Sequence, residues 1–173
     1  MEEMLRGRGA DALTGSRYVP IAVPSQYVAI AVYFDQQALP DLAAHFYRQA
    51  EEERMHAMKF VRFMLETGAQ PVIPEQPALR NDFKSAADAV GYALQQELKV
   101  TDQINNLVTI ATRESDHTTR EFLQWFVTEQ VEEVDSMGQL LRTIEHAKDN
   151  LLLVEDYVRR HQQADAAGGA EAD

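Results

Sequence analysis

Three prolines interrupt the middle of the chain and restrict the folds that it can adopt. Pro71, Pro74 and Pro77 lie in residues 69–83, between two long stretches whose apolar residues recur with helical spacing. This segment is too long for a tight turn between antiparallel helices. A helix of 28 residues is roughly 42 Å long at about 1.5 Å per residue, and the segment is long enough to run beside it. We therefore predict a long crossover between the second and third helices of a bundle.

The remaining segments predict four helices of a bundle and a short fifth helix. We expect helices at residues 25–37, 41–67, 86–113, 120–147 and 151–161, with Gly68 as a stop, Ser85 as an N-cap and a polar break at 115–119. Residues 1–24 hold glycines and prolines, which predicts an irregular N-terminal segment and a truncated first helix. We expect residues 162–173 to form a disordered acidic tail. The predicted fold class is all-α, with the bundle at residues 25–161.

Composition and charge exclude several kinds of site. The chain has no cysteine, which excludes disulfides, thiolate metal sites and cysteine nucleophiles. Its net charge of −12 would repel nucleic acid phosphates and attract cations, so we expect no nucleic acid partner. We find no apolar run long enough to span a membrane, and no basic start followed by an apolar stretch. We therefore expect a cytoplasmic protein with no membrane partner.

Carboxylates recur at helical spacing on three of the predicted helices. Glu53 and His56 are three residues apart on the second helix and so share a face. Gln130 and Glu133 have the same spacing on the fourth helix, and Glu97 lies among apolar residues of the third. An oxygen and a nitrogen ligand on one helix face could hold a metal ion that prefers such donors, such as iron.

These glutamates also have a simpler interpretation. A glutamate on a helix is most often a solvated charge on an exposed face, and a lone histidine is most often an ordinary core residue. Three helices that direct carboxylates toward one apolar core favour a bound cation instead, because uncompensated buried charges are costly. The sequence therefore predicts a carboxylate-rich metal site inside the bundle.

Two stretches resemble a known family. QAEEERMHAM (residues 49–58) and FLQWFVTEQVEEV (residues 122–134) are similar to the helix B and helix D motifs of non-haem bacterial ferritins, which belong to the ferritin-like di-iron family. The resemblance runs from about residue 26 to residue 158 and includes YVAIAVYFD and IPEQPALRNDF. It implies an iron-storing cage of 24 copies of the chain and a two-iron ferroxidase centre in each subunit.

The resemblance also implies roles for particular side chains. Glu53 and His56 would bind the first iron, Glu97 would bridge the two irons, and Glu133 would bind the second, with Gln130 close by. A third iron position would use Glu52, Glu129 and Glu132. Tyr27 would lie beside the catalytic centre and Trp125 would lie near it, although ordinary core packing accounts for both aromatic residues equally well.

The chain departs from the family pattern at one important position. The family's first helix supplies a glutamate to the first iron, seven residues before the tyrosine, and Pro20 occupies that position here. Proline offers no ligand atom and disfavours a helix, so the first iron would lose a protein ligand. Haem-binding relatives carry a methionine two residues before the helix B histidine. Here that residue is Arg54, so we expect iron but no haem.

Three functional hypotheses follow. The first is an iron-storage protein that oxidises Fe(II) with dioxygen at the two-iron centre. The second is a structural or storage subunit of the cage whose centre is impaired by Pro20. The third is a helical adaptor without metal. For the first two, the resemblance implies acidic channels for iron entry, with Glu114, Asp116 and Glu121 as candidate channel residues, although a plain solvated loop is the alternative for these acids.

Overall fold

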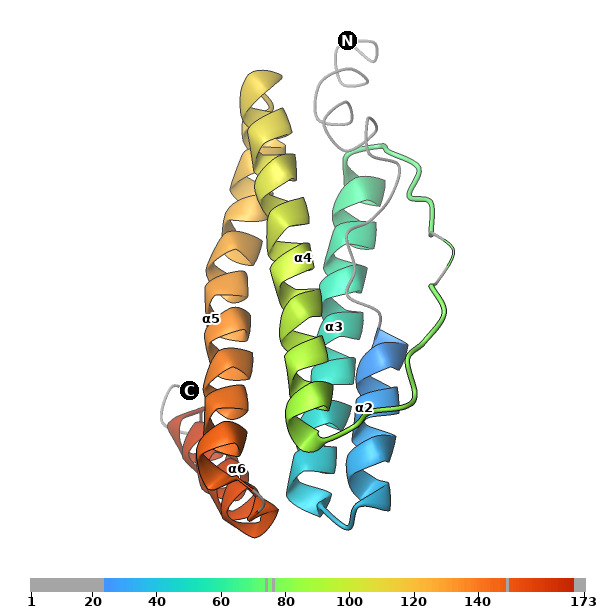
Figure 1. Ribbon diagram of the computed structural model, residues 1–173. Helices are drawn as coiled ribbons and strands as arrows, with labels where there is room; N and C mark the ends of the chain where they lie inside the picture. The colour runs from blue at the N-terminus through green and yellow to red at the C-terminus, as the bar shows by residue number, and fades with distance from the viewer. Residues whose placement is uncertain (1–23, 74, 76, 149, 170–173) are drawn as a thin grey trace, which may run out of the picture.

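The computed structural model describes residues 24–73, 75, 77–148 and 150–169, and these residues are mainly helical (Figure 1). The helices are α2 (Pro24–Gln36), α3 (Pro40–Glu66), α4 (Ala86–Arg113), α5 (His117–Ala147) and α6 (Leu151–Gly169). No strand occurs in this described part of the chain. The prediction of an all-α bundle with a shorter fifth helix is therefore confirmed.

Two helical hairpins make up the bundle (Figure 1). The α2–α3 hairpin turns at Ala38 and the α4–α5 hairpin turns at Ser115, and both residues have positive φ angles of 57° and 58°. The segment between α3 and α4 runs back along the bundle, so that α4 starts at the end where α3 starts. This is the predicted long crossover. At 13 residues, α2 is about half as long as α3, which has 27.

Local signals in the sequence set several helix ends. Helix α3 ends just before Gly68, whose φ of 81° is a conformation that glycine adopts without strain. Helix α4 begins after Ser85, whose side chain accepts a 3.1 Å hydrogen bond from the backbone N–H of Asp88. Both ends were predicted from the sequence and are confirmed.

Two other helix ends differ from the prediction. Helix α5 begins at His117 instead of residue 120, because the Asp116 side chain caps it by accepting a 3.0 Å hydrogen bond from the Thr119 N–H. Helix α6 continues to Gly169, well past the expected end at residue 161 and into the predicted tail. The irregular segment predicted at residues 1–24, including Pro20, lies outside the described residues except for Pro24, which starts α2.

The apolar core consists of two clusters separated along the bundle axis. One cluster joins α2, the first half of α3, the start of α4 and the end of α5 with α6, and Ile30, Phe46 and Met137 lie within it. The other joins the second half of α3 with the end of α4 and the start of α5, around Phe60 and Phe126. The residues between these clusters are polar, and they form the candidate site described below.

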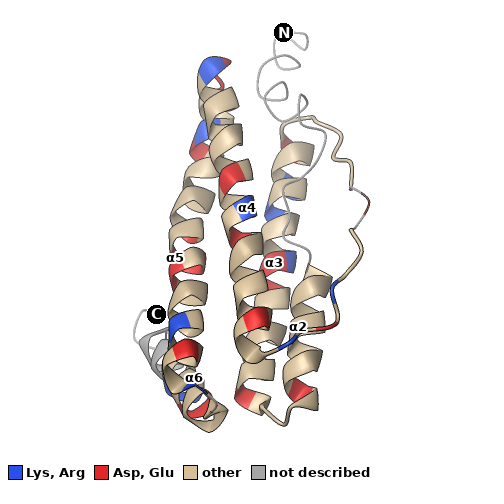
Figure 2. Cartoon of the chain, viewed as in Figure 1, with Lys and Arg blue, Asp and Glu red and all other residues tan. Residues whose placement is uncertain are grey.

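Acidic side chains are spread along the helices (Figure 2), in keeping with a net charge of −12. No helix in the described part of the chain is long and apolar enough to cross a membrane.

Helix α6 is attached to the bundle by a buried carboxylate. Leu39, the N-cap residue of α3, makes no side-chain capping bond. The Glu155 side chain does so instead from α6, accepting hydrogen bonds of 2.9 Å and 2.7 Å from the backbone N–H groups of Asp41 and Leu42. A negative charge at a helix N-terminus is also favoured by the helix dipole. Glu155 therefore caps α3 across the tertiary structure.

We expect Glu155→Ala to lower the free energy of unfolding by about 1–3 kcal/mol, because it leaves two backbone N–H groups without their acceptor. Urea unfolding followed by circular dichroism would measure this change. Asp156→Ala is the matched control, since among the described residues Asp156 forms ion pairs with the exposed Arg159 and Arg160 side chains, and it should leave stability nearly unchanged. Equal effects of the two substitutions would contradict the capping role.

Candidate metal centre

A layer of polar side chains crosses the bundle between the two apolar clusters. Glu53 of α3, Glu97 of α4, and Gln130 and Glu133 of α5 are all buried. Glu97 is fully buried, and Glu53 and Glu133 are only 3% and 7% exposed, which is rare for glutamate. The predicted site residues of three helices therefore come together inside the molecule and are not solvated surface charges.

Glu97 is held by hydrogen bonds from two neighbouring helices. The Tyr27 hydroxyl of α2 donates to one carboxylate oxygen of Glu97, and the Gln130 amide of α5 donates to the other at 3.1 Å. Burial raises the pKa of Glu97 to about 7, although the bond from Gln130 acts in the opposite direction. Tyr27 is thus a buried contact of the layer as well as a core residue, stacked on Phe46 with ring centroids 6.2 Å apart.

His56 lies between two glutamates. Its Nδ1 is 3.2 Å from a carboxylate oxygen of Glu53 on the same helix, and its Nε2 is 3.6 Å from Glu129 on α5. The indole of Trp125 packs edge-on against the imidazole, with ring centroids 5.3 Å apart. Trp125 is 40% exposed and also contacts the Phe126 ring and the Lys59 ammonium, so it covers the histidine from the outer side.

The electrostatic environment of Glu133 disfavours an ionised carboxylate more strongly than that of Glu97. Its pKa is raised to about 9, first by burial and then by the negative charges of four other glutamates, Glu97, Glu53, Glu52 and Glu129. A buried carboxylate near other carboxylates is stabilised either by a proton or by a cation. The layer and its His56 neighbour offer carboxylates, an amide and an imidazole, a donor set that suits iron.

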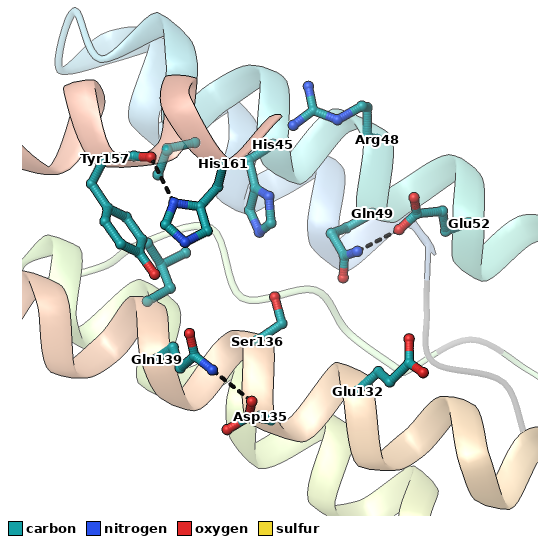
Figure 3. A pocket seen from close by; sticks show the side chains of 12 residues that line it. His45, Arg48, Gln49, Glu52, Glu132, Asp135, Ser136, Gln139, Tyr157 and His161 are labelled. Atoms are coloured by element: carbon teal, nitrogen blue, oxygen red, sulfur yellow. Dashed lines mark hydrogen bonds between the residues drawn. The ribbon is translucent and has the colours of Figure 1, made fainter. Parts of the chain in front are cut away.

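The three glutamates predicted for a third iron position lie beside this layer. Glu52 accepts a hydrogen bond from the Gln49 amide, and burial raises the pKa of its carboxyl group. Glu129 contacts His56, as described above. Glu132 is exposed and, with Glu52, lines a cavity between α3 and α5 (Figure 3). The structure brings Glu52 and Glu129 next to the layer and leaves Glu132 at its outer edge.

Among the described residues, no three Asp, Glu, His or Cys side chains are arranged as a ready set of metal ligands. The reason is visible in the hydrogen bonds, because Tyr27 and Gln130 occupy the two oxygens of Glu97, and Glu53 faces Nδ1 of His56. Metal binding would require these side chains to exchange such bonds for metal contacts. The ligand assignment from the sequence therefore stays a prediction.

Two side chains that support the layer were not predicted from the sequence. Thr101 accepts a 3.2 Å hydrogen bond from the Gln130 amide and itself donates to the Glu97 carbonyl, four residues earlier. Gln49 holds Glu52, three residues later. Both lie one helical turn from a predicted site residue, and that spacing is the signal that could have identified them.

The three candidate channel residues differ from one another in their surroundings. Glu114 is exposed and paired with Arg113 at 2.9 Å, and Glu121 is also exposed. Asp116 is buried and caps α5, so within the subunit it has a structural role.

Comparison with known proteins agrees with the fold. Residues 21–147 match the family model described as Ferritin-like domain. The chain is 46% identical to Ferritin BfrB of Mycolicibacterium smegmatis over 153 residues, covering 84% of each chain. It is 37% identical to the Bacterial non-heme ferritin of Staphylococcus aureus over 107 residues, which cover 62% of this chain and 64% of that protein.

Solved structures give the same result. An open pore ferritin from the archaeon Archaeoglobus fulgidus superposes with a TM-score of 0.79 at 30% identity, covering 86% of this chain and 93% of that one. The family match spans well over half of the chain, and the relatives share both sequence and fold. The chain therefore belongs to the ferritin family, as a bacterial member of this group of iron-storing proteins.

Proposed function

We propose that the protein oxidises Fe(II) with dioxygen at the buried polar layer and stores the resulting Fe(III) as a mineral inside a multi-subunit cage. The observation that carries this proposal is the burial of Glu133 in a layer with buried Glu53 and Glu97, where the charges of neighbouring glutamates raise its pKa. A site with this surplus of negative charge favours cations, and its oxygen and nitrogen donors suit iron. The relationship to other ferritins supports the storage role.

In this proposal iron is the substrate, and Glu53, His56, Glu97, Gln130 and Glu133 form the place where two Fe(II) ions meet dioxygen. Each Fe(II) gives one electron, so that two Fe(III) ions are formed, and one dioxygen takes up these two electrons with two protons and leaves as hydrogen peroxide. The protein supplies position and charge, while the irons supply the redox chemistry. Before iron enters, Tyr27 and Gln130 fix the orientation of Glu97, and Glu133 gives up its proton when a cation enters.

A second function has a specific observation in its favour. Pro20 occupies the position at which the family resemblance implies a glutamate ligand, and proline cannot bind iron through its side chain. The protein would then be a storage or structural subunit that oxidises iron slowly. One kinetic experiment separates the two functions.

We expect rapid oxidation when metal-free protein is mixed with two Fe(II) ions per chain in oxygenated buffer, followed by stopped-flow absorbance in the near ultraviolet. The Glu53→Ala, His56→Ala double variant should lose at least an order of magnitude in initial rate, because it removes an oxygen and a nitrogen ligand. Glu51→Ala is the matched control, since Glu51 lies on the exposed face of α3 and pairs with Arg54.

Wild-type oxidation as slow as that of the double variant would contradict the proposed oxidation and favour the storage subunit. In that case Pro20→Glu, which introduces a carboxylate at the missing position, should speed the reaction.

We also expect the stability of the metal-free protein to fall as the pH rises from about 5 to 9. Glu133 keeps its proton in the folded state up to a pKa of about 9, whereas the unfolded chain loses it near 4.5. Between these values the unfolded state binds fewer protons, so each pH unit lowers the free energy of unfolding by up to about 1.4 kcal/mol. Urea unfolding at several pH values measures this slope.

Glu133→Gln should flatten this slope above pH 7, because below pH 7 Glu97, whose pKa is raised to about 7, contributes to the fall as well. The exposed neighbour Glu132→Gln should leave the slope unchanged. Addition of Co(II), a redox-stable divalent ion, should raise the free energy of unfolding of the wild-type protein at pH 8, because the cation replaces the proton. A slope that is the same in all three proteins would show that Glu133 is not the titrating group.

A further inference from the structure

The three threonines of α4 donate their hydroxyl hydrogens back to their own helix. Thr101, Thr109 and Thr112 each bond the backbone carbonyl four residues earlier, at 2.9, 2.9 and 2.8 Å. This is an ordinary use of threonine inside a helix. Helix α5 lies beside α4 (Figure 1), and among the described residues only Thr101 of the three also bonds to a side chain of α5. Thr101 therefore has a contact that its helical position alone does not explain.

That contact determines which end of the Gln130 amide faces α4. The amide nitrogen lies 3.1 Å from Oε2 of Glu97, 3.2 Å from the Glu97 carbonyl oxygen and 3.2 Å from the Thr101 hydroxyl. A hydroxyl has one hydrogen, and Thr101 donates it to the Glu97 carbonyl, so toward Gln130 it can only accept. An amide donates through its nitrogen alone. Thr101 therefore requires the nitrogen of Gln130, and not the oxygen, to face α4.

This orientation leaves the amide oxygen as the free end of Gln130. The side chain is buried and lies three residues before Glu133, so the two share a face of α5. The amide nitrogen makes every bond of Gln130 to a described residue, and none of these residues donates to its oxygen. Only the oxygen has lone pairs for a cation, because the nitrogen carries two hydrogens. The value of Gln130 as a ligand thus depends on which way its amide is turned.

Thr101 matters most when a cation is bound. In the metal-free layer, Oε2 of Glu97 also holds the Gln130 nitrogen. A cation that enters the layer draws this carboxylate oxygen to itself, and the bond to Gln130 is then weakened. The Thr101 hydroxyl carries no charge, is not among the proposed iron ligands and is fixed by its bond to its own helix. It therefore remains as the side-chain acceptor that holds the amide in place.

We infer that Thr101 is a positioning residue of the layer, which accepts a hydrogen bond from the Gln130 nitrogen and thereby keeps the Gln130 oxygen turned toward a bound cation. Thr101 does not touch the cation itself and acts only through the amide. Hydrogen bonds to a metal ligand from residues behind it commonly set the orientation of that ligand. The inference rests on the proposed binding of cations at the layer and adds to it a residue that is not a ligand.

The test is a titration of the metal-free, full-length protein with Co(II), followed by the visible absorption of bound cobalt. Thr101→Val keeps the shape of the side chain and removes the hydroxyl. We expect Co(II) binding to weaken about fivefold, the effect of losing one hydrogen bond of ordinary strength. The absorption spectrum of the bound cobalt should also change, because an oxygen ligand is no longer held in place. Thr101→Ser keeps the hydroxyl and should restore both the affinity and the spectrum.

Three further variants make the test specific. Thr109→Val removes the same backbone bond from an exposed position of the same helix, and it should leave the affinity and the spectrum nearly unchanged. Gln130→Met removes the amide, and adding Thr101→Val to it should cause no further loss, because the amide through which Thr101 acts is gone. The Glu53→Ala, His56→Ala double variant identifies the cobalt signal that belongs to the layer. Thr101→Ala provides the test if Thr101→Val does not fold.

An unchanged affinity and spectrum in Thr101→Val would overturn the inference while leaving the proposed function intact, since cobalt would still bind at the layer. An equal loss in Thr109→Val, or a further loss when Thr101→Val is added to Gln130→Met, would also overturn it, because Thr101 would then act by another route. A wild-type protein that binds no Co(II) at the layer would contradict the proposed function itself, and the inference would fall with it. The wild-type titration therefore separates the two failures.

Discussion

Three glutamates are buried between two apolar clusters, namely Glu53, Glu97 and Glu133. The helices of the bundle must offset the energetic cost of burying them. A buried carboxyl group is stable in such a place only if it receives hydrogen bonds, keeps a proton or binds a cation. Glu97 has hydrogen bonds from α2 and α5, whereas the pKa of Glu133 is raised by the glutamates around it. The layer therefore has an affinity for positive charge that its packing does not satisfy.

Polar contacts between distant parts of the chain hold the two hairpins around this layer. Tyr27 connects α2 to Glu97 on α4. The neighbouring Gln26 exchanges two hydrogen bonds, of 2.8 Å and 2.9 Å, with the backbone of Arg80 in the crossover. Glu155 attaches α6 to the start of α3. Each contact satisfies buried backbone or carboxylate groups, so the same bonds that position the site also stabilise the fold.

The sequence predictions that succeeded rested on local interactions, although not every local interaction was identified. The limits of α4 were predicted because Ser85 caps the helix through a residue three positions away. The start of α5 was missed because Asp116 was assigned to a polar break and not to the cap of the helix. Glu53 and His56 could be paired by their spacing of three residues. Gln49 and Thr101 were overlooked, although each lies one helical turn from a predicted site residue, because spacing shows which residues share a face and not which of them form hydrogen bonds there.

The sequence by itself determined the helices, the crossover and the faces that carry the carboxylates, since helical periodicity, prolines and caps act over a few residues. Only the tertiary structure decided that Tyr27 and Gln130 hold Glu97, that the charges of four other glutamates raise the pKa of Glu133, and that α3, α5 and α6 line one cavity. Those facts depend on contacts between residues far apart in the chain. Burial and the sum of neighbouring charges arise only when the helices pack together, and these two quantities give the site its chemistry.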